Sequence, residues 1–194
     1  MGTRGTFGFR SNGKDKLGYN QFDSYPSGRG VVVLEELKEI LKTKGVDYLK
    51  QRVDAMRLVS DEEKPTAEDI EKLKPYTDLG VSRQSTDDWY CLTRKSHGDI
   101  KLMLEAGYMG NSNEFINDSL FCEWGYIINL DDNVLEVYKG FQSEEHNLGR
   151  YADNKPDRGY YPCALIATFP FDNLPSEEEF LAKLEPPEEE EATA

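Results

Sequence analysis

Residues 19–30 read Y-N-Q-F-D-S-Y-P-S-G-R-G and connect a predicted strand to a predicted helix. Proline disfavours the helical conformation of the residue before it, so we expect Tyr25 to be extended. Gly28 and Gly30 predict a turn, because glycine accepts positive φ angles. Apolar residues at helical spacing begin at Val31. This stretch therefore predicts a loop that leaves a strand and enters a helix.

The loop also concentrates polar and aromatic side chains. Tyr19, Gln21 and Asp23 alternate along it, which would place a phenol, an amide and a carboxylate on one side. Arg29 adds a cation, and the free N–H groups of the following helix start would favour an anion. The glycines fit neither a phosphate loop nor a dinucleotide fingerprint. A ligand-binding loop and a plain strand-to-helix connection both remain open.

The residues around the loop predict the rest of the N-terminal half. A strand over 3–10, an Asn-Gly turn and a return strand over 17–22 form a hairpin. Helices are expected over 30–44 and 46–59, and a short helix between Pro65 and Pro75 begins with a capping-box spacing at Thr66 and Asp69. A further helix is expected over 99–106. Residues 89–92 fit a strand or a helix start equally well.

The C-terminal half predicts a second hairpin, with strands over 121–130 and 134–138 joined at Asp131-Asp132-Asn133. A long polar loop over 142–159, a strand over 160–169 and a helix after Pro175 follow. The predicted fold class is α+β, with a mostly antiparallel sheet of two hairpins plus a C-terminal strand, and helices packed on one face. We expect a single domain over 1–185 and an acidic disordered tail over 186–194.

Composition limits the function classes. The 194 residues carry a net charge of −14, which argues against general nucleic-acid binding but allows a basic protein partner. The three cysteines are far apart, so no zinc or other metal site is expected, and no cofactor motif is present. We expect no membrane association and a cytoplasmic location, since no apolar run spans a bilayer and no signal peptide is visible. The start M-G-T-R-G-T formally matches a myristoylation pattern but also suits a strand.

Several segments carry a resemblance to a known family. They are M-G-T-R at the start, the 19–30 loop, D-W-Y-C-L-T-R, S-L-F-C-E-W-G-Y-I-I-N-L-D and L-E-V-Y-K-G-F, in that order. The chain resembles, from Met1 to about Pro175, an uncharacterised family of phages, bacteria and fungi whose members begin M-G-T-R and carry a Q-[FW]-D-x-Y-P-S-G motif. No activity is established for that family, so the resemblance transfers no catalytic residue. A phage origin would imply an accessory, host-interaction or anti-defence role in the host cytoplasm.

Three catalytic arrangements have weak sequence support. Thr3 could act as an N-terminal nucleophile, but only after a cleavage beyond the removal of Met1. Cys122 could be a nucleophile with His97 or His146 as its base, although a buried strand cysteine is the ordinary outcome. Asp23 and Glu123 could form a carboxylate pair for acid and base catalysis. We therefore leave enzymatic activity uncertain and lean against it.

The leading hypothesis is a non-enzymatic binding or accessory protein that holds a small polar or anionic ligand, or a partner protein, at the 19–30 loop. A small N-terminal-nucleophile hydrolase and an acidic decoy that inhibits a basic host protein are the alternatives. The predicted ligand-binding residues are Arg4, Gln21, Asp23, Tyr25, Ser27, Arg29, Glu123 and Trp124. The sequence does not decide whether the loop and the 121–130 strand meet in space.

Overall fold

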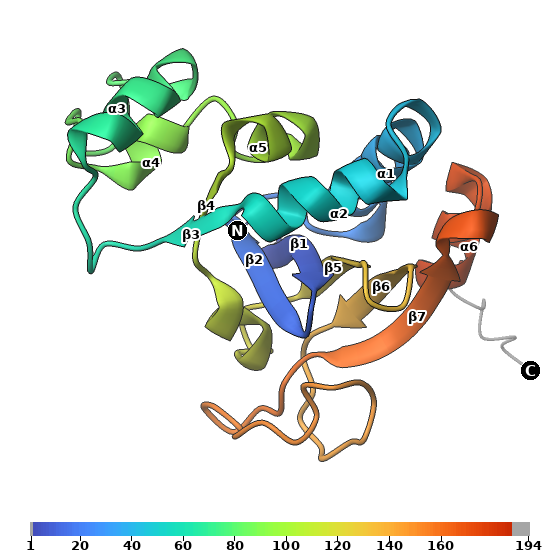
Figure 1. The fold of residues 1–194 in the computed structure, drawn as a ribbon. Coiled ribbons are helices and arrows are strands. Elements are labelled where there is room, and N and C mark those ends of the chain that lie inside the picture. The colour runs from blue at the N-terminus through green and yellow to red at the C-terminus, as the bar shows by residue number, and fades with distance from the viewer. Residues whose placement is uncertain (1, 188–194) are drawn as a thin grey trace, which may run out of the picture.

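A computed structural model describes residues 2–187 and contains a five-stranded mixed sheet with helices packed against it (Figure 1). The strands lie in the order β2-β1-β5-β6-β7. Three of the four neighbouring pairs are antiparallel, and β1 pairs with β5 in parallel. The predicted α+β class with two hairpins and a C-terminal strand is confirmed. The strands are β1 Gly5–Ser11, β2 Lys14–Asn20, β5 Trp124–Asn129, β6 Val134–Lys139 and β7 Ala164–Pro170.

The first hairpin turns at Asn12 and Gly13, which have φ angles of 53° and 70°. Both backbone N–H groups donate to the carboxylate of Asp131, at 2.7 and 2.9 Å. Asp131 follows β5, so the turn of one hairpin is bound to the turn of the other. The Asn-Gly signal therefore predicted this turn correctly, because both residues tolerate positive φ.

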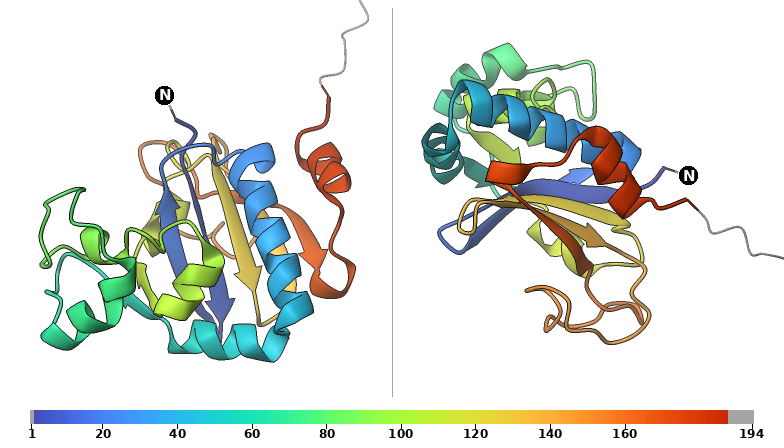
Figure 2. Two further views of the ribbon diagram at one scale, coloured as in Figure 1. Left: turned by 90° about the horizontal axis from the view of Figure 1, so that it is seen from above. Right: turned by 90° about the vertical axis from the view of Figure 1, so that its right-hand side faces the viewer.

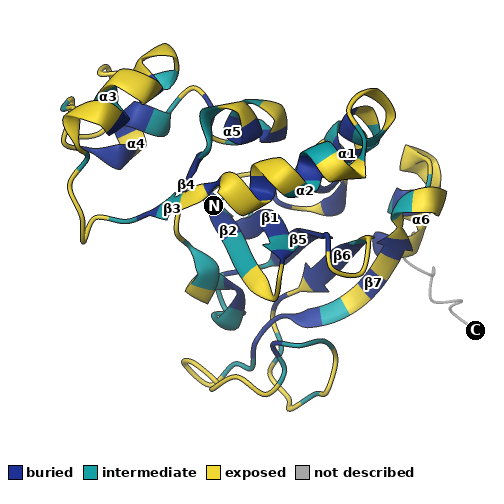
Figure 3. Ribbon diagram, viewed as in Figure 1, coloured by how far each residue is buried: buried dark blue, intermediate teal, exposed yellow. Residues whose placement is uncertain are grey.

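Four helices pack on one face of the sheet (Figure 2). They bury a continuous core against Phe7 and Phe9 of β1, Tyr126 of β5 and Val137 of β6. The buried apolar stripe of α1 has the predicted helical spacing, and Figure 3 shows its exposed side turned to solvent. The helices are α1 Val31–Thr43, α2 Val46–Ala55, α5 Ile100–Ala106 and α6 Glu177–Leu184.

The opposite face of the sheet is covered by chain without long helices. A second cluster of buried residues forms there around Leu17, Ile127 and Tyr138. The long 142–163 segment is held by Arg150, whose Nη1 donates to both oxygens of Glu136 at 2.7 Å. This segment is therefore bound to the sheet, although it has almost no regular structure.

A smaller unit projects from the sheet beyond β2. It contains the two-stranded parallel pair β3 Arg57–Val59 and β4 Tyr108–Gly110, with α3 Ala67–Leu73 and α4 Trp89–Thr93. The helix predicted over 46–59 ends at Ala55, and its last residues form β3 instead. Residues 89–92, which the sequence left open, are helical. Short irregular helices complete the chain: η1 Pro26–Gly30, η2 Lys74–Tyr76, η3 Asn113–Asn117 and η4 Phe171–Asn173.

None of the helices within residues 2–187 has the length and apolarity needed to cross a membrane. The predicted disordered tail falls largely on residues 188–194, which lie outside the described residues.

Candidate functional site

The 19–30 loop is held together by its own hydrogen bonds. The Asn20 amide is buried at the end of β2 and donates to the Ser24 hydroxyl at 2.7 Å. Asp23 has a φ of 55°, and its carbonyl oxygen accepts the Arg29 N–H at 2.8 Å. A side chain at Gly28 would place Cβ 2.3 Å from that same carbonyl oxygen. The loop therefore requires glycine at position 28 because backbone lies against it.

Most of the N–H groups of the predicted backbone anion site are bonded within the loop. The N–H groups of Gly28 and Gly30 donate to the Tyr25 carbonyl oxygen, at 2.9 and 3.4 Å, and that of Arg29 donates to Asp23. Three of the N–H groups expected to be free are thus bonded within the loop, since the chain bends through η1 before α1 begins. Anion binding at this loop therefore depends mainly on side chains.

The loop and strand β5 do meet in space. The Tyr126 hydroxyl donates to the Ser24 carbonyl oxygen at 2.8 Å, and Gly30 lies so close that a Cβ there would be 2.9 Å from the Tyr126 ring. The backbone of Trp124 lies near the loop on the other side of Gly5. A Cβ at Gly5 would lie 2.4 Å from the Trp124 carbonyl oxygen and 2.7 Å from the Ser24 Cβ. The contact therefore rests mainly on Tyr126, which is not among the predicted ligand-binding residues.

Half of the predicted ligand-binding residues line one cleft of about 770 Å³, here called the outer cleft. These residues are Gln21, Asp23, Ser27 and Arg29. The other four line other parts of the molecule. Arg4 lies over the Phe121 ring at 4.4 Å, and Trp124 is buried beneath Lys139. Tyr25 and Glu123 do not line the outer cleft either.

Arg29 serves the fold as well as the cleft. Its Nη1 donates to the Gly98 carbonyl oxygen at 2.6 Å, and its Nη2 donates to Asn20 at 3.3 Å. The guanidinium also lies 5.0 Å from the centre of the Phe7 ring. Burial lowers the pKa of Arg29, although the group stays charged at neutral pH. Arg29 therefore supplies positive charge to the outer cleft, and its hydrogen bond to Gly98 also binds the turn at Gly98 to the loop.

The catalytic candidates with weak sequence support, Thr3, Cys122 and the pair of Asp23 and Glu123, lie in different parts of the structure. Burial raises the pKa of the Cys122 thiol well above its usual value, so the thiol is protonated at neutral pH. Within residues 2–187, no hydrogen bond joins Cys122 to His97 or His146. The Thr3 carbonyl oxygen accepts the Ser24 N–H at 3.0 Å. Asp23 lines the outer cleft, and its proposed carboxylate partner Glu123 does not.

Three residues that sequence reasoning did not assign to a ligand site form the opposite wall of the outer cleft. They are Tyr90, Arg94 and His97, from α4 and the turn after it. The Tyr90 and His97 rings lie 6.2 Å apart, and the Arg94 guanidinium lies 5.9 Å from the Tyr90 ring. Only Tyr90 lies within α4, so a helix assigned to residues 89–92 would not by itself have placed Arg94 and His97 on the same wall.

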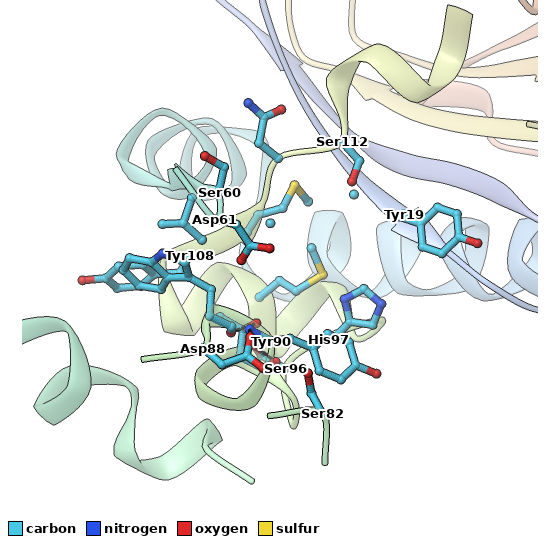
Figure 4. A pocket seen from close by; sticks show the side chains of 18 of the residues that line it. Tyr19, Ser60, Asp61, Ser82, Asp88, Tyr90, Ser96, His97, Tyr108 and Ser112 are labelled. Atoms are coloured by element: carbon cyan, nitrogen blue, oxygen red, sulfur yellow. Dashed lines mark hydrogen bonds between the residues drawn. The ribbon is translucent and has the colours of Figure 1, made fainter. Parts of the chain in front are cut away.

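A second hollow of about 380 Å³, here called the inner pocket, shares Tyr19, Tyr90 and His97 with the outer cleft. Figure 4 shows Tyr90 and His97 on one side of it, and Ser60 and Asp61 on another. Phe7, Met103 and Met109 contribute apolar surface, and loops and α4 contribute most of the remaining wall. The two hollows therefore adjoin at these three aromatic residues.

The two hollows differ in charge. Arg29 and Arg94 line the outer cleft against one carboxylate, Asp23. Asp61 and Asp88 line the inner pocket against one cation, Arg83. Asp88 caps α4 by accepting the Tyr90 N–H at 2.9 Å, and its side chain is buried. In a chain of net charge −14, the outer cleft is thus a local region of positive charge.

His97 lies at the boundary of the two hollows. Solvent reaches the ring, yet the surrounding protein lowers the pKa of His97, and the charges of Arg94 and Arg29 lower it further. An imidazole with a pKa below its usual value of about 6.5 is neutral at pH 7. It can therefore donate one hydrogen bond and accept another without adding charge.

Comparison of the chain with protein-family models, with curated proteins and with solved structures gives no match. The resemblance to the M-G-T-R family therefore remains an expectation. Among residues 2–187, no three or more His, Cys, Asp or Glu side chains are grouped in a way that could hold a metal ion.

Proposed function

We propose that the protein is a non-enzymatic binding protein that holds a small anion with a planar group in the outer cleft. The observation that carries this proposal is the pairing of two guanidinium groups with exposed aromatic rings in one cleft of a strongly acidic chain. Phe22 and Tyr90 line that cleft and are 63% and 46% exposed. Guanidinium groups bind carboxylate and phosphate oxygens, and exposed rings stack on planar groups.

Arg94 is the residue best placed to bind the anion. Arg29 already donates to Gly98 and Asn20, whereas Arg94 has no ion pair with a carboxylate in the part of the chain described here. The Arg94 side chain is held over Tyr90, which orients the guanidinium at the cleft wall. Gln21 and Ser27 are exposed at the same cleft and can complete the hydrogen bonding.

The first test is native mass spectrometry of freshly purified protein, which should reveal a retained small mass. The second is a titration with phenyl phosphate, a probe that combines an anion with a ring. Removal of a hydrogen bond to a charged group typically costs about 1.5–3 kcal/mol, so Arg94→Gln should weaken binding at least about 10-fold. Lys95→Gln is the matched control, because Lys95 is exposed in the same turn and lines neither hollow.

The proposal predicts that Lys95→Gln binds phenyl phosphate as the wild type does. Equal affinities of wild type, Arg94→Gln and Lys95→Gln would contradict it, as would the absence of any binding. Melting temperatures of the two variants should match that of the wild type, because neither side chain takes part in an ion pair within residues 2–187.

A further inference from the structure

The inner pocket adds information about the ligand beyond its anionic group. It shares Tyr19, Tyr90 and His97 with the outer cleft, so the two hollows lie next to each other. Its volume of about 380 Å³ lies within the range of about 300–1,000 Å³ found for small-molecule sites. Because the inner pocket is smaller and its charged lining is mainly acidic, the part of a ligand that enters it has to be more compact and less negative than the part in the outer cleft.

The lining of the inner pocket favours a flat, polar ring. Trp89 and Tyr108 stack with their centroids 6.0 Å apart at one side, and Met103 and Met109 add polarizable thioethers. Hydroxyl groups of Ser60 and Ser112 lie on the walls with the carboxylate of Asp61. Apolar surface with a few polar groups is typical of a site for a heterocycle.

Asp61 specifies one further property of the ring. Its only ion pair within residues 2–187 is with Arg83 at 3.4 Å, and both side chains are largely exposed, at 72% and 61%. Such a pair contributes little, so the carboxylate can accept hydrogen bonds from a ligand. An ionised carboxylate only accepts, which favours a ring that carries an N–H donor such as an exocyclic amino group.

We propose that the ligand is a nucleoside monophosphate whose base carries an amino group. The phosphate lies at Arg94 and Arg29 in the outer cleft, the base enters the inner pocket toward Asp61, and Tyr90 and His97 flank the sugar between them. This assignment rests on the proposed function, because it places the phosphate at the same guanidinium groups. The neutral imidazole of His97 suits a sugar hydroxyl, to which it can donate or from which it can accept.

The test compares three probes by isothermal titration: AMP, IMP and phenyl phosphate. IMP replaces the amino group of AMP by a carbonyl, so it cannot donate to Asp61 from that position. The wild type should bind AMP about 10-fold more tightly than IMP and than phenyl phosphate. Asp61→Asn should remove most of the preference for AMP over IMP, whereas Glu62→Gln should keep it. Glu62 is the matched control, since it is the exposed neighbouring carboxylate and does not line the inner pocket.

The outcomes separate the two proposals. Binding of phenyl phosphate that depends on Arg94, with AMP bound no more tightly, overturns the nucleotide assignment and leaves the anion site standing. An AMP preference that survives in Asp61→Asn also overturns the assignment of the base to the inner pocket. Failure of all three probes, or binding that ignores Arg94→Gln, overturns the proposed function itself.

Discussion

The hydroxyl of Tyr126 donates a hydrogen bond of 2.8 Å to the carbonyl oxygen of Ser24. Tyr126 lies in the middle of β5, and Ser24 lies in the loop that forms the outer cleft. Both residues are buried, and burial raises the pKa of Tyr126, so its hydroxyl keeps its proton. This bond ties the shape of the loop to the centre of the sheet.

Tyr126→Phe should therefore destabilise the protein and loosen the loop. The substitution leaves the Ser24 carbonyl oxygen without this donor in a buried position, and such a loss costs about 1–3 kcal/mol. Urea unfolding should show the loss, and phenyl phosphate should bind less tightly. Tyr76→Phe is the control, because no hydrogen bond of its hydroxyl occurs within residues 2–187. Equal stability of wild type and Tyr126→Phe would contradict the prediction.

Gly28→Ala should displace the loop. The new Cβ would lie 2.3 Å from the Asp23 carbonyl oxygen, and backbone cannot move aside as a flexible side chain can. We expect a loss of about 1–3 kcal/mol in unfolding free energy and weaker ligand binding. A Cβ at Gly110 would meet no atom within 4 Å, so Gly110→Ala should keep the wild-type stability. Similar melting curves for the two variants would show that the loop tolerates the clash.

Arg150 should be essential for the long 142–163 segment. It pairs with Glu136, which is buried, and also contacts Tyr138 and Tyr151. Removing one partner leaves a buried charge unpaired, so Arg150→Leu should cost about 3–5 kcal/mol. Arg158→Leu in the same segment should cost less than about 1 kcal/mol, because its side chain is 55% exposed. Chemical denaturation of the two variants gives the comparison, and equal losses would be inconsistent with a special role for Arg150.

Glu36 should make stability depend on pH. Burial, Asp99 and Glu39 together raise the pKa of Glu36 to about 7. The hydrogen bond from the Ile100 N–H and the charge of Arg29 lower the pKa but only partly offset this rise. Between the unfolded value near 4.5 and about 7, the folded state binds more protons than the unfolded state, so stability falls as pH rises through this window.

Glu36→Gln removes this titration. Its stability relative to the wild type should therefore be higher at pH 8 than at pH 5, as measured by thermal unfolding at both values. The difference should be smaller than the full pKa change implies, since the side chain keeps some contact with water. Glu35→Gln is the control, because Glu35 is exposed on the same helix and is not one of the groups that shift the pKa of Glu36. A gain in stability that does not change with pH would contradict this assignment.

Local signals in the sequence were sufficient for much of the fold. The capping boxes at Thr66 with Asp69 and at Ser176 with Glu179 are both formed, because each needs only residues three positions apart. The small parallel sheet was not predictable in this way. Its strands have three residues each, and Arg57 pairs with Tyr108 far along the chain, so neither strand shows a period of its own.

The candidate site was predicted in part for a related reason. Side chains that follow one another in the loop, such as Gln21 and Asp23, reach the same cleft. The opposite wall, with Arg94 and His97, comes from the turn after α4, a helix too short to show its periodicity. The hydrogen bond from Arg29 to the Gly98 carbonyl oxygen also joins distant segments of the chain, which no local pattern reveals.

The parallel pairing of β1 with β5 has a consequence for synthesis of the chain. During translation the N-terminal hairpin emerges well before residues 124–129, its partner strand in the centre of the sheet. Until then one edge of β1 offers unpaired N–H and C=O groups and the buried rings Phe7 and Phe9 lack part of their cover. Such non-local pairing slows folding and exposes the nascent chain to aggregation. After β1, the ribosome has to deliver residues 12–123 before the partner strand β5 follows.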